Sequence, residues 1–190
     1  MIKDLIRQNR SYRRFDNEHT ITRKELEQLI ELARISASAS NRQALRFYIT
    51  YSDPDNDKVF SCLKWAGYLS EWQGPAPVER PTAYIVILKP ADLSAYIGHD
   101  TGIACQSILL GAVEMGLGGC MFGSVDKPQL QTLLNLPAEY SIELVIALGK
   151  PTEIVQIDTV KNNDIKYWRD SDRTHHVPKR KLQELIINSE

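Results

Sequence analysis

The sequence predicts a single domain in which α-helices and β-strands contribute to one core. The chain has 190 residues, of which 43% are apolar, and this length suits one domain with a sizeable buried core. Apolar residues at i, i+3, i+4 and i+7 spacing predict an amphipathic helix over residues 22–35. Two apolar runs rich in β-branched residues, 82–88 and 141–148, predict buried strands.

The first half of the chain predicts alternating helices and strands. The helix over 22–35 opens with Thr22 and Glu25, which have the spacing of a capping box. The strand over 45–51 rests on β-branched and aromatic residues, and the strand over 82–88 is central because it is apolar almost throughout. The expected elements are a short opening helix, a helix over 22–35, a polar loop over 36–41, a strand over 45–51, a helix over 56–69, a Gly- and Pro-rich loop over 73–81 and the strand over 82–88.

The second half predicts a long helix, two more strands and a tail. Residues 99–115 are apolar or small on most sides, which indicates a helix buried in a core or an interface. A short strand beginning at Cys120, a helix from Asp126 to about 134 and the strand over 141–148 complete a compact body of about residues 1–151. The tail of about residues 152–190 contains one expected helix, over 179–188, and is too long for a loop within a compact domain. We expect this tail to wrap a second subunit.

Composition excludes several classes of protein. Three widely spaced cysteines and four histidines show no metal-binding spacing, so we expect neither a metal site nor a disulfide framework. Charges interrupt the first 15 residues where a signal peptide is apolar, and no segment reaches the ~18 apolar residues of a membrane span. Motifs of serine hydrolases and of P-loop nucleotidases are missing. We therefore expect a soluble cytoplasmic protein without a membrane partner.

Basic residues gather at both ends of an otherwise acidic chain. The net charge is −1, from 23 Lys and Arg against 24 Asp and Glu. Residues 3–14 carry five basic residues and one acid, and residues 161–181 carry seven basic residues and three acids. Two small basic clusters suit a compact phosphate better than a nucleic acid, which favours a broad basic face. The alternative is that these residues are solvated surface charges.

Three short segments contain candidate ligand-binding residues. Arg10 and Arg13 flank Ser11, and two guanidinium groups beside a hydroxyl can hold a phosphate. Short polar side chains in the loop after the first amphipathic helix either read the edge of a heterocycle or only turn the chain. Glycines after the long helix either end that helix or bring main-chain N–H groups against a flat ligand.

In this order, the motifs resemble the nitroreductase family of FMN-dependent oxidoreductases over nearly the whole chain. The matching segments are R-S-x-R (Arg10, Ser11, Arg13), S-x-x-N-x-Q (Ser38, Asn41, Gln43), a helix with Asp100, Gly102, Ala104, Gln106 and Leu109, a G-L-G segment (Gly116, Leu117, Gly118) followed by Gly119, and a basic pair, Lys179 and Arg180. The chain departs from the family pattern at Asn9, Ala37 and Leu45, where the family often has Arg, Pro and Trp. The missing Trp changes the space offered to an acceptor above the flavin.

The resemblance implies an α+β fold with a mixed, mostly antiparallel sheet flanked by helices. It also implies a homodimer that exchanges carboxyl-terminal tails and binds FMN at the interface. The implied cofactor-binding residues are Arg10, Ser11, Arg13, Lys179 and Arg180 for the phosphate and ribityl chain, Ser38, Asn41 and Gln43 for the pyrimidine edge, and Gly118 and Gly119 for the isoalloxazine ring.

The implied activity is hydride transfer from NADH or NADPH through FMN to a small acceptor such as a nitroaromatic or a quinone, by a ping-pong mechanism. The flavin carries the chemistry, so no side chain needs to act as acid or base. Trp65, Tyr68 and Trp72 either form a lid near the acceptor or, at helical spacing, belong to the core. Two alternatives are a related FMN enzyme that dehalogenates or oxidises another substrate, and a non-catalytic FMN-binding protein.

Overall fold

The centre of the molecule is an antiparallel sheet in which β5 has a neighbour on each side. The computed structural model describes residues 1–93 and 97–188. Strand β5 pairs with β3 along one edge and with β4 and β1 along the other, and β2 pairs with the far edge of β3. The strands are β1 (Phe15–Asp16), β2 (Arg46–Thr50), β3 (Ala83–Pro90), β4 (Gly118–Phe122) and β5 (Tyr140–Pro151).

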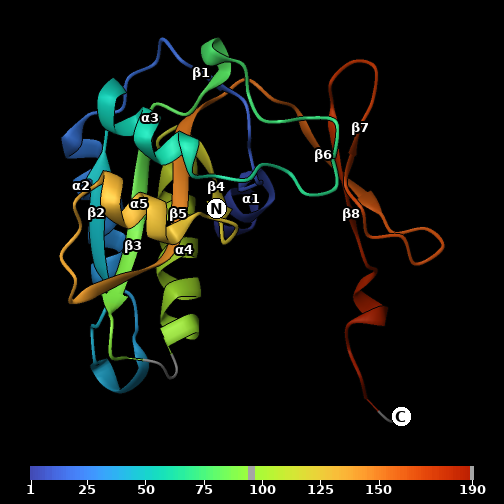
Figure 1. The fold of residues 1–190 in the computed structure, drawn as a ribbon. Coiled ribbons are helices and arrows are strands. Elements are labelled where there is room, and N and C mark those ends of the chain that lie inside the picture. Colours follow the sequence, from blue (N-terminus) through green and yellow to red (C-terminus); the bar gives the residue numbers. More distant parts are fainter. Residues whose placement is uncertain (94–96, 189–190) are drawn as a thin grey trace.

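Helices cover both faces of this sheet (Figure 1). They are α1 (Ile2–Gln8), α2 (Arg23–Arg34), α3 (Asp53–Ser61), α4 (Ile97–Glu114) and α5 (Lys127–Leu133). Successive residues of a strand point to opposite faces. In β3, Ile85 and Ile87 pack in the cluster that includes residues of α2 and α4, whereas Tyr84 and Val86 pack with residues of α3 and α5. The side chains of β3 on both faces of the sheet are buried from solvent, which confirms β3 as a central strand.

Local sequence signals placed several elements correctly. The Thr22 hydroxyl accepts a hydrogen bond from the Glu25 main-chain N–H at 3.3 Å, and the Glu25 carboxylate accepts one from the Thr22 N–H at 2.7 Å. The Asp126 carboxylate accepts from the Gln129 N–H at 3.1 Å and caps α5. These reciprocal bonds satisfy main-chain donors that the first turn of a helix leaves free.

The helix predicted over 56–69 is present only in its first part, and its extension beyond Ser61 is wrong. Helix α3 begins at Asp53 and ends at Ser61, and the next residues turn toward the loop before α5. Leu63 forms a β-bridge with Val125, and the Lys64 N–H donates to the Ser124 carbonyl at 3.0 Å. Pairing with a distant segment therefore takes the main-chain groups that a continued helix would need.

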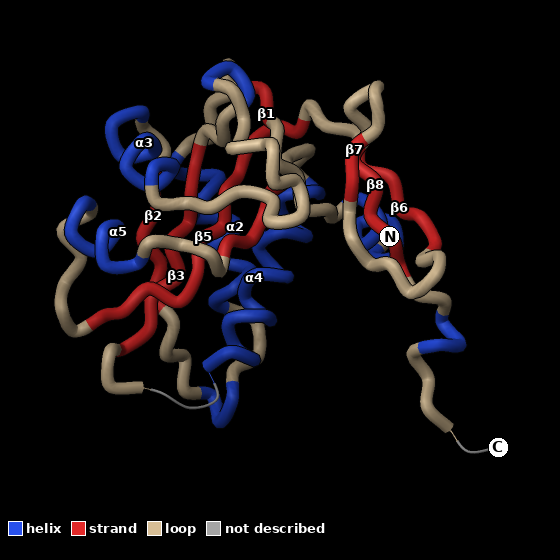
Figure 2. Tube along the Cα trace, turned by 45° about the vertical axis from the view of Figure 1, so that its right-hand side comes forward, coloured by secondary structure: helices blue, strands red, loops and turns tan. Residues whose placement is uncertain are grey.

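The tail forms a second, small sheet that ends at Lys179, and the predicted helix over 179–188 is wrong. Strands β6 (Val155–Thr159) and β8 (His175–Lys179) are parallel, and β7 (Trp168–Arg169) is antiparallel to β8. Only a short 3-10 turn, Leu182–Glu184, follows. Figure 2 shows this small sheet beside the main body. In the described part of the chain, none of the helices combines the length and apolar character that crossing a bilayer requires.

The tail contacts its own chain before it departs. Tyr167 lies against Tyr68 with ring centroids 4.9 Å apart, and Arg173 forms an ion pair with Glu79. After Lys179 the chain leads away from the body (Figure 1). This last segment has four exposed apolar side chains, Leu182, Leu185, Ile186 and Ile187.

Candidate functional site

A pocket lies where the two basic ends of the chain meet. It has a volume of about 270 Å³ and is called here the basic pocket; the lining residues that matter below are Arg10, Ser11, Arg13, Gly119, Tyr167, His175 and Lys179. The segment after α1 supplies the first three, and β8 supplies His175 and Lys179. The structure therefore brings together two segments that the sequence analysis paired by charge and by the family resemblance. Arg180 does not line this pocket and forms an ion pair with Glu184 at 3.6 Å.

Arg13 is held in a fixed position at the wall of the basic pocket. Its main-chain N–H donates to the Glu153 carboxylate at 2.9 Å. Its guanidinium Nη1 donates to the Ser11 carbonyl and lies 3.2 Å from His175 Nε2, and the group sits 4.9 Å from the centroid of the Tyr167 ring. Because an arginine side chain loses much rotamer freedom when it is fixed, these contacts reduce the entropy cost of binding an anion.

Glu153 joins the tail to the amino-terminal segment. Its side chain is fully buried and accepts hydrogen bonds from Arg169 Nε and Nη2 at 3.0 and 2.6 Å, besides the bond from Arg13. The Arg169 guanidinium lies 4.1 Å from the ring centroid of Trp72. A buried carboxylate needs such partners, because an unpaired charge away from water is costly.

Two buried nitrogens beside the pocket have no hydrogen-bond partner among the described residues. They are Arg10 Nε and His175 Nδ1. Arg10 Nη2 is satisfied, since it donates to the Ile6 carbonyl at 2.8 Å. A buried donor left unpaired costs roughly 1–3 kcal/mol. The unpaired Arg10 donor at a basic pocket suits a ligand that supplies acceptor oxygens.

His175 is neutral near pH 7. Burial, reinforced by the positive charges of Arg13 and Arg169, lowers the pKa of His175 to about 4. An arginine nitrogen can only donate, so His175 Nε2 accepts from Arg13 and the ring proton is on Nδ1.

Gly118 and Gly119 serve the packing of the protein itself. A Cβ on Gly119 would lie 2.5 Å from the Ala147 carbonyl oxygen, and one on Gly118 would lie 2.6 Å from the Tyr12 ring. The Gly119 main chain reaches the basic pocket, where its carbonyl accepts from the Tyr12 N–H at 3.1 Å. The missing side chain of Gly119 therefore makes room for β5, and the place of its main chain against a flavin ring stays a prediction. The left-handed turn after α4 occurs earlier, at Gly116 with φ +74°.

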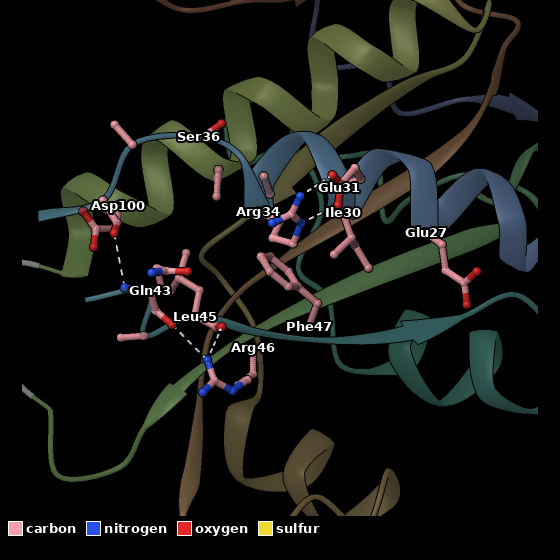
Figure 3. A pocket seen from close by; sticks show the side chains of 15 residues that line it. Glu27, Ile30, Glu31, Arg34, Ser36, Gln43, Leu45, Arg46, Phe47 and Asp100 are labelled. Carbon is pink, nitrogen blue, oxygen red and sulfur yellow. Dashed lines mark hydrogen bonds and ion pairs between the residues drawn. The ribbon is translucent and has the colours of Figure 1, made fainter. Parts of the chain in front are cut away.

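Ser38 and Gln43 lie at a different pocket of the chain. This cavity, called here the loop pocket, has a volume of about 360 Å³ and is bounded by α2, the loop over 36–45 and the start of α4 (Figure 3). Asp100 Oδ1 accepts from the Ala39 N–H at 2.8 Å and ties the loop to α4. Asn41 is exposed in the same loop, and Gln43 Nε2 donates to its side-chain oxygen at 3.2 Å. One chain therefore carries the predicted cofactor residues at two separate places.

The loop over 38–43 has a strained main chain. Ser40 and Asn41 have φ of 52°, and Gln43 has φ of 49°. Asn tolerates this left-handed region better than Ser or Gln does. Strain of this kind persists only where surrounding contacts impose it, and it is frequent at ligand-binding sites.

The three predicted lid aromatics lie in the irregular segment after α3, which is not helical despite their spacing in the sequence. Trp65 is buried in the core, with its ring centroid 4.6 Å from that of Phe122. Tyr68 is half exposed and reaches the basic pocket only through Tyr167. Trp72 packs against Trp65 and Arg169. Trp65 therefore follows the core alternative.

Sequence reasoning missed three residues of the basic pocket and its support, Tyr167, His175 and Glu153. No local pattern marks them, because their partners are far away in the sequence. The position of His175 four residues before Lys179, in a strand-like run, is the one signal that could have pointed to it.

Comparison with known proteins gives relatives over most of the chain. The chain is 29% identical over 177 residues to Protein DrgA of Synechocystis, with 79% of this chain and 84% of the relative covered. It is 23% identical over 171 residues to the iodotyrosine deiodinase of Thermotoga neapolitana, with 80% and 90% covered. The solved structure of an FMN-dependent nitroreductase from Clostridium difficile has the same fold, with a TM-score of 0.65, 20% identity and 90% and 94% of the chains covered.

A family model described as the nitroreductase family matches residues 6–150. This match runs from the end of α1 through nearly all of β5, and thus includes the amino-terminal half of the basic pocket and the loop pocket. The small sheet that supplies His175 and Lys179 lies beyond the matched range. The chain belongs to the nitroreductase family.

Proposed function

We propose that the protein takes hydride from NADH or NADPH and reduces a small acceptor, such as a nitroaromatic or a quinone, with FMN as its cofactor. The observation that carries this proposal is the basic pocket, where Arg10, Arg13 and Lys179 converge from both ends of the chain. Family membership supports FMN as the group that the pocket holds. The proposal keeps the cytoplasmic location expected from the sequence.

The residues of the basic pocket fit the phosphate and ribityl chain of FMN. Arg13 is preorganised, and Arg10 Nε is a buried donor that lacks a partner among the described residues. Ser11 offers a hydroxyl, and Lys179 adds a third positive charge. Bonds between such groups and a phosphate are charge-assisted and about twice as strong as neutral ones.

When bound, FMN supplies the hydride chemistry, accepting from the nicotinamide and donating to the acceptor in turn. The chain itself positions the ring and shapes the space above it. The exposed amides of Asn41 and Gln43 present donors and acceptors to a pyrimidine edge. Tyr68 and Trp72 keep a proposed place at the edge of the acceptor site, because Tyr68 covers the pocket residue Tyr167.

A homodimer would join the two halves of the site. The basic pocket, at about 270 Å³, is smaller than the roughly 300–1,000 Å³ of ordinary cofactor and ligand pockets, so it takes only part of an FMN. Apolar side chains are exposed on neighbouring helices, Ile2 and Ile6 on α1 and Ile103 on α4. We propose that this surface pairs with its copy and brings the loop over 38–43 of one subunit to the basic pocket of the other.

The segment after Lys179 completes the proposed dimer. Its side chains Leu182, Leu185, Ile186 and Ile187 are exposed in one chain, and Ile187 is 95% exposed. Exposed apolar residues in a contiguous run mark an interaction surface. We propose that residues 181–188 are the exchanged part of the tail and that they cover the partner subunit.

The test is the spectrum and redox behaviour of the purified protein. We expect yellow protein that releases FMN on heating, and bleaching of the bound flavin by NADH or NADPH without oxygen. Addition of a nitroaromatic or a quinone should restore the colour. Colourless protein that takes up no added FMN would contradict the cofactor assignment. Bound FMN that neither nicotinamide reduces would favour a non-catalytic flavin-binding protein.

A second candidate function is reductive dehalogenation with the same cofactor. The similarity to an iodotyrosine deiodinase favours it. The chain also lacks the family's frequent Trp at Leu45, in the segment that lines the loop pocket, which changes the space offered to a substrate. Release of iodide from iodotyrosine by the reduced protein, compared with turnover of nitroaromatics and quinones, distinguishes the two functions.

A further inference from the structure

Arg13 divides its guanidinium between the protein and the pocket. Nη1 makes both protein contacts, with the Ser11 carbonyl and with His175 Nε2. Among the described residues, Nη2 and Nε have no hydrogen-bond partner. The donors of a guanidinium lie in one plane at fixed angles. Fixing one nitrogen and the plane of the group therefore also fixes the direction of the other nitrogens. His175 and Tyr167 together set that direction.

His175 is itself rigidly placed. Its side chain is 1% exposed, and its main-chain N–H donates to the Ile154 carbonyl at 2.8 Å. Its ring lies 5.1 Å from the ring of Tyr167, and its strand pairs with β6 on one side and β7 on the other. The acceptor nitrogen at Nε2 is therefore part of the preformed pocket wall.

The charges around His175 permit only its neutral form in this role. Arg13, Arg14, Arg169 and His176 act on it with positive charge. The buried carboxylate of Glu153 bonds to the Arg13 main chain and to Arg169, and has no bond to the His175 ring. A protonated imidazole has no lone pair, so it would lose the bond from Arg13 and repel its guanidinium.

We propose that His175 is a positioning residue that aims the free edge of the Arg13 guanidinium at the phosphate of FMN. This inference rests on the proposed function and concerns one contact within it. The neutral ring acts as an acceptor for Arg13 and does not contact the phosphate. Its contribution therefore depends on Arg13 and on the presence of a phosphate in the ligand.

Two matched substitutions test the position of the acceptor. In His175→Gln the side-chain oxygen reaches the place of Nε2, whereas in His175→Asn it reaches only the place of Nδ1. Affinity is measured by flavin fluorescence for FMN and for riboflavin, which lacks the phosphate. We expect His175→Asn to weaken FMN about 10- to 100-fold, the range of a hydrogen bond to a charged group, and to leave riboflavin unchanged. His175→Gln should keep the wild-type ratio of the two affinities.

A double-mutant cycle and a pH series show whether His175 orients the Arg13 guanidinium or only packs in the pocket wall. In an Arg13→Ala background, His175→Asn should have no further effect on FMN affinity. Lowering the pH from 6 to 4 should reduce the FMN-to-riboflavin affinity ratio more in the wild type than in His175→Gln; the phosphate titrates equally in both. Equal loss of both flavins in His175→Asn, or an undiminished effect without Arg13, would overturn the inference. If His175→Asn does not fold, the pH comparison alone decides between the two outcomes.

The proposed function fails in a different way. Wild-type protein that binds neither FMN nor riboflavin contradicts the cofactor assignment itself. Wild-type protein that binds FMN, with His175→Asn and His175→Gln both matching it, leaves the cofactor assignment in place and rejects only the role of His175.

Discussion

His175 and His176 are adjacent in β8 and have opposite protonation behaviour. His175 faces the Arg13 guanidinium, while His176 Nδ1 lies 2.7 Å from an Asp158 oxygen and its Nε2 lies 3.1 Å from an Asp170 oxygen. The His176 ring also stacks on Trp168, with centroids 3.9 Å apart. Neighbouring strand residues point to opposite faces, so one strand places one imidazole among cations and the next among carboxylates.

These surroundings predict a stability maximum between two pH limits. Hydrogen bonds that His176 donates to the Asp170 and Asp158 carboxylates raise the pKa of His176, so its stabilisation is complete below the unfolded pKa of about 6.5 and is lost as the pH rises through the higher folded value. For His175 the pKa is lowered to about 4, so stability is lost as the pH falls from about 6.5 toward 4. Urea unfolding across pH 4–9 checks both limbs.

Single substitutions show which histidine causes the loss of stability at acid pH and which causes the loss at alkaline pH. His176→Gln should remove the alkaline loss and leave the acid loss, and His175→Gln should do the reverse. An alkaline loss that persists in His176→Gln would show that another group causes it.

Substitution of Arg13 should weaken FMN binding specifically. Arg13→Ala removes a preorganised charged donor from the basic pocket, and we expect a loss of roughly 1.5–3 kcal/mol in binding free energy. Lys24→Ala is the matched control, because Lys24 is an exposed cation on α2 and does not line this pocket. Titration of both variants with FMN at fixed ionic strength measures the difference. Wild-type affinity in Arg13→Ala would refute its role.

Gly119→Ala should destabilise the fold more than it disturbs the cofactor. The new Cβ would meet the Ala147 carbonyl and Leu109 in the space between β4, β5 and α4, and overpacking of this kind typically costs about 1–3 kcal/mol. Urea unfolding gives the free energy of unfolding, and FMN titration below the transition gives the affinity of folded protein. Gly123→Ala is the control, since a Cβ there meets nothing within 4 Å. A large loss of affinity with unchanged stability would instead support a glycine needed by the flavin.

Two truncations separate the functions of the tail. Deletion of 181–190 removes the exposed apolar segment and leaves His175 and Lys179 in place, so we expect loss of the dimer and weakened FMN binding, with the basic pocket itself retained. Deletion of 152–190 also removes Glu153 and β8, so the remaining flavin binding should be lost as well. Size-exclusion chromatography with light scattering and the flavin spectrum report the two properties. A flavin-loaded monomer of the longer deletion would contradict this division.

The sequence predicted what local chemistry determines. The capping box of Thr22 and Glu25 and the doubly buried β3 needed no knowledge of distant residues. Two errors arose where distant pairing decided the structure. The bridge between Leu63 and Val125 ends α3 early. The pairing of 155–159 with 175–179 keeps the chain extended up to the residue where the helix over 179–188 was expected to begin.

The charged residues of the candidate site could be predicted from the sequence, whereas the residues that hold Arg13 in place could not. Arg10, Arg13 and Lys179 followed from the clusters at both ends and from the family resemblance. Glu153 and His175 act through Arg13, and no spacing in the sequence announces a partner 140 or 162 positions away. Ser38 and Gln43 lie at the loop pocket, apart from the basic pocket, and only the proposed second copy of the chain would join them to it.

The separation of 162 positions between Arg13 and His175 also sets the order of events during synthesis. The amino-terminal segment leaves the ribosome long before β8 does. Its guanidinium groups therefore lack their β8 partners while the central sheet forms. Contacts that close such long loops form slowly, because the chain loses conformational entropy on closing the loop before packing stabilises the contact. On the proposed function, a chain that ends before β8 would lack this part of the cofactor site. Cofactor loading through the basic pocket would then report that translation has passed Lys179.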